Sequence, residues 1–69
     1  MPRRFLIHPR AAGRFTVMED GGQATHEFGN MLEAVRFVRE QRLGRELIMA
    51  LCNERGEVTF SQMIYPLTP

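Results

Sequence analysis

The chain has 69 residues, one cysteine and a formal net charge of +1 at pH 7. This length predicts one domain, near the lower size limit of chains that fold without metals or disulfides. The apolar content of 43% excludes intrinsic disorder over most of the chain, and a single cysteine excludes an internal disulfide. Because no apolar run approaches about 18 residues and no signal-peptide pattern opens the chain, we expect a cytoplasmic protein that does not cross a membrane.

Three strand candidates precede the helix. Residues 4–8 and 14–18 are rich in apolar and aromatic side chains, and Pro9 ends the first of these strands. The Asp-Gly-Gly sequence at 20–22 predicts a turn. Residues 24–28 form a shorter third candidate.

A single helix is predicted to begin after Asn30. Asn30 is a suitable N-cap, and Glu33, three residues later, completes a capping-box-like Asn-x-x-Glu sequence. Gly44, which follows Leu43, is placed to end the helix as a left-handed C′ residue. An apolar stripe at helical spacing predicts the face that packs on the sheet, and it comprises Met31, Ala34, Val35 and Val38.

A hairpin is predicted after the helix. An apolar strand spans 46–52, and the sequence Asn-Glu-Arg-Gly at 53–56 suits a type I turn followed by a glycine bulge. Residues 57–65 return as the second arm. Pro66 ends this arm, so residues 66–69 are expected to form a C-terminal tail of the single domain 1–69.

These elements predict an α+β fold in which one helix packs on one face of a four- to five-stranded antiparallel sheet, in the order ββ(β)αββ. The strand order stays open, because the first and last hairpins can pair in more than one way. The expected core comprises Phe5, Ile7, Phe15, Val17, Val35, Val38, Val58 and Phe60.

The apolar run at 47–52 predicts an interaction surface. Its side chains are apolar on both faces of the strand, whereas one helix covers only one face of a sheet. If the hairpin loop is bulged, Cys52 faces Val58, and the uncovered face carries a candidate interface of Leu47, Met49, Leu51 and Met63. Without the bulge, the alternate set of Ile48, Ala50 and Cys52 is uncovered instead, because a one-residue slip flips every side chain.

Read in this order, the chain resembles the DUF2188-type family of small bacterial ββαββ domains of unknown function. The resemblance rests on the strand ending at Pro9, the strand 13–18, the stretch 22–25 and Glu33-Ala34 within the helix. It continues through 44–47 entering a strand, Arg55-Gly56 in a turn, the strand from Val58 and Tyr65 near its end. Phe15 stands where the family often has tryptophan, and 54–56 stands where Asp-Gly is typical. The resemblance implies a fold and supplies no site residues.

The sequence predicts no catalytic, cofactor-binding or metal-ligating residues. His8, His26 and Cys52 lack the spacing of metal ligands, and no nucleophile is accompanied by a base. We therefore expect a non-enzymatic interaction module that needs no cofactor. Its expected partner is a second copy of the chain, as a homodimer, or another protein.

Nucleic-acid binding is the alternative function. All nine basic residues are arginines, whose planar guanidinium groups suit phosphate recognition, although codon bias in a GC-rich genome explains the absence of lysine more simply. The candidate contacts are Arg4, Arg10 and Arg14 of the first hairpin, together with arginines of the helix. Glutamates interleaved with the helix arginines weaken this alternative.

Overall fold

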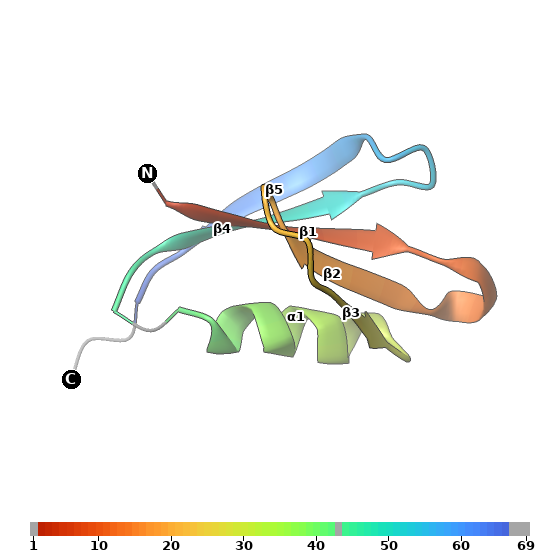
Figure 1. Ribbon diagram of the computed structural model, residues 1–69, viewed down its shortest axis with the longest axis horizontal. Coiled ribbons are helices and arrows are strands. Elements are labelled where there is room, and N and C mark those ends of the chain that lie inside the picture. Colours follow the sequence, from red (N-terminus) through yellow and green to blue (C-terminus); the bar gives the residue numbers. More distant parts are fainter. Residues whose placement is uncertain (1, 43, 67–69) are drawn as a thin grey trace.

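The computed structural model describes residues 2–42 and 44–66, and these residues form an α+β fold with one α-helix below a five-stranded sheet (Figure 1). The α+β class and the single helix are therefore confirmed. In chain order the elements are β1 (Arg3–Pro9), the 3-10 turn η1 (Ala11–Gly13), β2 (Phe15–Glu19), β3 (Thr25–Phe28), α1 (Met31–Glu40), β4 (Leu47–Cys52) and β5 (Val58–Ile64).

The sheet is mixed, with the strand order β3-β2-β1-β4-β5. The expectation of an entirely antiparallel sheet is wrong, because β4 pairs in parallel with β1. The direction follows from the chain path: β3 runs in the same direction as β1, α1 returns across the sheet, and β4 then runs in the direction of β1 (Figure 1). The helix thus takes the place of a reversing strand.

The helix begins where the sequence predicts. Asn30 Oδ1 accepts a hydrogen bond from the Glu33 N–H at 2.8 Å, which satisfies one of the unpaired donors of the first turn. The helix ends at Glu40, with Gln41 as the C-cap, and therefore earlier than expected. Gly44 does adopt the left-handed conformation (φ +74°), but it lies in the connection to β4 and does not cap the helix. Leu43 lies outside the described residues.

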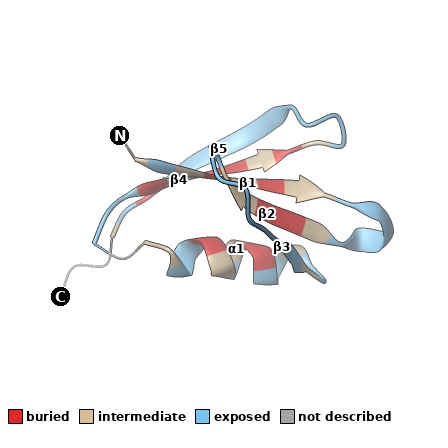
Figure 2. Cartoon of the chain, viewed as in Figure 1, coloured by how far each residue is buried: buried red, intermediate tan, exposed pale blue. Residues whose placement is uncertain are grey.

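The core lies between α1 and the sheet face above it. It is formed by Ala34 and Val38 of the helix together with side chains from β1, β2, β4 and β5 (Figure 2). Phe15 and Val35, which were expected in the core, are half-buried and pack against it. The buried sheet residues of this cluster are Phe5, Ile7, Val17, Leu47, Met49 and Ile64.

The β4–β5 hairpin has the turn predicted from the sequence, but its strands pair in a different register from the expected one. Asn53 Oδ1 accepts hydrogen bonds from the N–H groups of Arg55 and Glu57, both at 2.9 Å, and Cys52 faces Val58 as expected. The register then shifts between Leu51 and Cys52, so that Leu51 pairs with Phe60. This leaves Thr59 as an extra residue, and its hydroxyl donates to the Leu51 carbonyl at 3.3 Å.

Two expected core residues are exposed. Val58 retains 43% of its accessible surface and Phe60 51%, so their assignment to the core is wrong. The reason is the position of the helix, which makes its main contacts with β2 and β3, whereas β5 is the edge strand on the opposite side. The tip of the hairpin rises away from α1 (Figure 1).

Removing the N-cap should destabilise the fold measurably. We expect Asn30→Ala to lower the free energy of unfolding by about 1 kcal/mol, because the Glu33 N–H loses its acceptor. Asn30→Asp, which keeps the acceptor, should stay close to the wild type. Urea denaturation followed by circular dichroism measures both, and equal losses in the two variants would show that the cap does not act through this hydrogen bond.

Truncating the two methionines of the β4–β5 hairpin should have very different effects on the free energy of unfolding. Met49 is buried against the helix and Met63 is exposed on the sheet. Truncating Met49 to alanine leaves a cavity and should cost about 2–5 kcal/mol, a large part of the roughly 3–10 kcal/mol expected for a chain of this size. Met63→Ala should cost less than about 1 kcal/mol. Similar losses in both variants, measured by denaturant unfolding, would contradict the observed register.

Candidate functional site

The most unusual surface of the structure lies along β5. Every residue of this strand except Ile64 is exposed, as the pale blue colour of the strand shows (Figure 2). Large apolar side chains are normally scattered singly over a protein surface, whereas here they gather on one segment. We call this set the edge-strand cluster, and it comprises Val58, Phe60, Met63 and Tyr65.

The helix-free face of the sheet continues this apolar surface. Met63 pairs with Ile48, and Ser61 pairs with Ala50, which in turn pairs with Leu6 of β1. Ile48 and Leu6 are half-buried. Exposed and half-buried apolar side chains therefore lie on this face from β5 to β1, with the buried Ala50 between them and Arg4 beside Ile48.

The interface expected from the sequence is largely misplaced. Leu47 and Met49 are buried in the core on the helix side of the sheet, and Leu51 is half-buried against that core. None of the three side chains therefore belongs to an exposed apolar surface. The physical reason is the extra residue at Thr59, which shifts the register by one and exchanges the two faces of β4 relative to β5. Of the expected residues, Met63 alone is exposed.

The arginines proposed for nucleic-acid contacts each form an ion pair or a hydrogen bond with another side chain of the protein. Arg4 forms an ion pair with Asp20 (3.4 Å) and Arg14 with Glu27 (2.7 Å). Arg10 donates from Nε to the Thr16 hydroxyl at 3.1 Å. Arg4 lies near the start of β1 and the other two lie beyond its end, so the structure does not bring the three side chains together.

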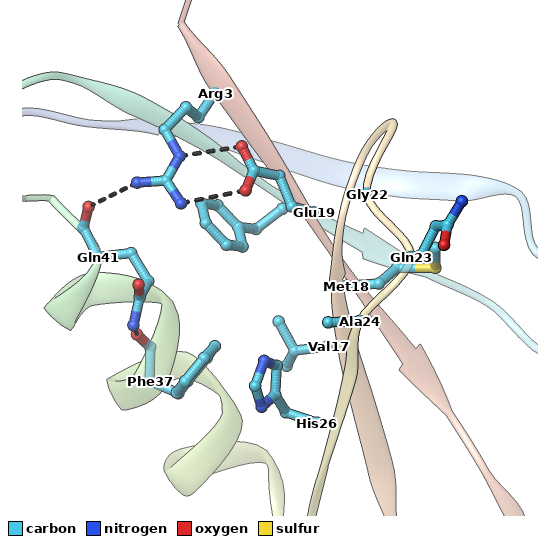
Figure 3. A pocket seen from close by; sticks show the side chains of 11 residues that line it. Arg3, Val17, Met18, Glu19, Gly22, Gln23, Ala24, His26, Phe37 and Gln41 are labelled. Atoms are coloured by element: carbon cyan, nitrogen blue, oxygen red, sulfur yellow. Dashed lines mark hydrogen bonds and ion pairs between the residues drawn. The ribbon is translucent and has the colours of Figure 1, made fainter.

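A shallow hollow of about 180 Å³ lies between the C-terminal half of α1, the start of β1 and the turn that follows β2 (Figure 3). The Arg3 guanidinium donates to both carboxylate oxygens of Glu19, at 2.9 and 3.0 Å, and to the Gln41 carbonyl at 3.5 Å. The ring centroids of His26 and Phe37, on the opposite wall, are 4.6 Å apart. No local sequence pattern points to this arrangement, because its residues come from distant segments.

The charges in this hollow neutralise one another. The hydrogen bonds from Arg3 lower the pKa of Glu19, and the same contact raises the pKa of Arg3. The volume is also below the roughly 300–1,000 Å³ of typical small-molecule pockets. The hydrogen bonds of Arg3 therefore connect β1, β2 and the end of α1. Neither the Arg3 guanidinium nor the Glu19 carboxylate is left available for a ligand.

Cys52 and the histidines form no reactive group. Burial raises the pKa of the Cys52 thiol, which disfavours the nucleophilic thiolate. Within residues 2–42 and 44–66, no three side chains among His, Cys, Asp and Glu are grouped closely enough to hold a metal ion. In the same part of the chain, no helix has the length and apolar character needed to cross a membrane.

Comparisons with protein-family models, curated proteins and solved structures found no match to this chain. The resemblance to DUF2188-type domains therefore stays a prediction from the sequence.

The Arg3–Glu19 pair should contribute stability that depends on pH. Because the pKa of Glu19 is lowered in the folded state, the contribution is complete above the ordinary carboxyl pKa and disappears as the pH falls through the lowered value. Both side chains are partly exposed, so we expect Glu19→Gln to cost about 0.5–1 kcal/mol at pH 7. The difference from wild type should shrink on acidification.

Unfolding curves recorded from pH 7 to about pH 2 check this expectation. Glu54→Gln, at an exposed position in the β4–β5 turn, serves as the control. A cost for Glu19→Gln that persists unchanged at the lowest pH would exclude the ion pair as its cause.

Proposed function

We propose that the chain is a non-enzymatic interaction module that self-associates through its helix-free sheet face, next to β5. The observation that supports this most directly is the edge-strand cluster, in which Met63 and Tyr65 retain 37% and 69% of their accessible surface. Exposed apolar groups gathered on one surface are typical of protein contacts. Burying them removes apolar area from water, which is the main driving force of association.

The absence of charge on β4 and β5 favours a second copy as the partner. Neither β4 (Leu47–Cys52) nor β5 (Val58–Ile64) contains a charged residue. A two-fold axis brings each surface against its own copy, so that any charge near the axis would meet a like charge. An uncharged apolar surface meets itself without repulsion.

The side chains at this surface are not suited to act on a substrate. The neighbouring thiol of Cys52 is buried, and its raised pKa keeps it protonated at neutral pH. The side chains of the edge-strand cluster include no acid or base besides the phenol of Tyr65. The surface is therefore suited to contact rather than to catalysis.

Nucleic-acid binding through Arg4, Arg10 and Arg14 is the less supported alternative. Arg4 and Arg14 would have to exchange their ion pairs with Asp20 and Glu27 for phosphates. Such binding would weaken steeply with rising salt, whereas association through apolar side chains would not. Measuring both at low and moderate salt separates the two functions.

Introducing a charge on the helix-free face should dissociate the assembly. We expect the wild type to sediment as a dimer at micromolar concentration and Met63→Glu to raise the dissociation constant at least about tenfold. Leu32→Glu is the matched control, because Leu32 is 67% exposed on the helix, away from the sheet. A wild type that stays monomeric up to about 100 μM, a dissociation free energy near 5.5 kcal/mol, would refute the proposal. Equal effects of the two variants would place the contact elsewhere.

A further inference from the structure

The two edges of the sheet are protected to different degrees against pairing with a strand of another chain. The backbone of an edge strand carries unpaired N–H and C=O groups, and natural proteins shield such edges with charges, proline, β-bulges or shortness. At the β3 edge, the strand has four residues and carries Glu27 in an ion pair with Arg14. At the β5 edge, the strand has seven residues and contains neither a charge nor a proline, and the extra residue at Thr59 is its one irregularity. β5 is therefore the less protected of the two edges.

We infer that β5 pairs antiparallel with β5 of a second copy about a two-fold axis perpendicular to the sheet. The two sheets then join into one sheet of ten strands, five from each copy. This inference rests on the self-association proposed above and places the contact at the β5 edge, next to the helix-free face, rather than on that face itself. Because the axis is perpendicular to the sheet, both helices lie on one side and both helix-free faces on the other.

Symmetry narrows the register of this pairing. Ser61 is the midpoint of Val58–Ile64, so the overlap that uses the full strand places Ser61 opposite its own copy. Phe60 then lies opposite Gln62 of the second copy, on the side that carries the helices. Met63 lies opposite Thr59 of the second copy. Cross-strand pairs of this kind stabilise a sheet in addition to its backbone hydrogen bonds.

The side chains of β5 favour a second copy over an unrelated extended peptide. Exposed apolar groups flank the strand on both faces, with Phe60 on the helix side and Met63 on the helix-free side. The strand offers no charge with which to select a charged peptide. A second copy supplies the same uncharged, apolar sequence in a matching length, so that each Phe60 and Met63 is covered from both chains.

Amide hydrogen exchange of the wild-type protein tests the pairing directly. We expect the outward-facing amides of β5 to exchange more slowly as the protein concentration rises through the dissociation constant. The outward-facing amides of β3 provide the internal control and should not change. A dimer whose β5 amides exchange at the monomer rate would overturn edge pairing while leaving self-association intact. A monomer at every concentration would overturn both.

A cysteine at the midpoint of β5 tests the register. Paired residues of antiparallel strands have Cα atoms about 4.5–5.5 Å apart, which lies within the range of a disulfide, about 4.4–6.8 Å. On a Cys52→Ala background, Ser61→Cys should yield a disulfide-linked dimer under mild oxidation by dissolved oxygen. Thr25→Cys, at an exposed position on the other edge strand that leaves the Arg14–Glu27 pair intact, should remain largely monomeric. Failure of the Ser61→Cys protein to link, with the dimer retained, would exclude this register, and preferential linking through Thr25→Cys would exclude the β5 edge.

Discussion

One short helix has to cover a sheet that is wider than itself, and this mismatch governs the structure. A helix is about 10 Å across and strands lie about 4.8 Å apart, so one helix spans roughly two strands. Here α1 makes its main contacts with β2 and β3, and the side chains of β1 and of the first half of β4 reach the same core. The far strand, β5, receives cover only at Ile64. The exposure of Phe60, on the helix side of β5, is the direct result.

The position of the helix is fixed by contacts at both of its ends. Asn30 caps the first turn, and the Arg3 guanidinium reaches the Gln41 carbonyl beyond the last turn while it holds Glu19. Phe37 packs against the rings of Phe28 and His26 on β3. These contacts hold the helix over the β2–β3 side of the sheet. The polar arrangement at Arg3 is thus part of the reason why β5 stays uncovered.

Local signals in the sequence predict local structure well in this chain. The N-cap at Asn30 and the turn after Cys52 depend on neighbouring residues, and both form as expected. The parallel pairing of β1 with β4 and the extra residue at Thr59 could not be read from the sequence, because they depend on distant segments. The alternation of Val58 and Phe60 predicts one buried face, but their partners Cys52 and Leu51 lie on opposite faces of β4, and the helix does not extend over β5. The sequence thus predicts an apolar surface on the hairpin where the exposed apolar side chains lie, but assigns Leu47, Met49 and Leu51 to the wrong face.

The contrast between the two sheet edges also limits how far an assembly can grow. Fibrous stacking of sheets requires a free edge on both sides of each subunit, so that every added copy offers a new one. In this protein the β3 edge is short and carries the Arg14–Glu27 ion pair. The pairing proposed at β5 would use the uncharged edge of each copy and leave the two β3 edges outward. The uncharged β5 edge thus favours the proposed dimer, whereas the short, charged β3 edge opposes further growth.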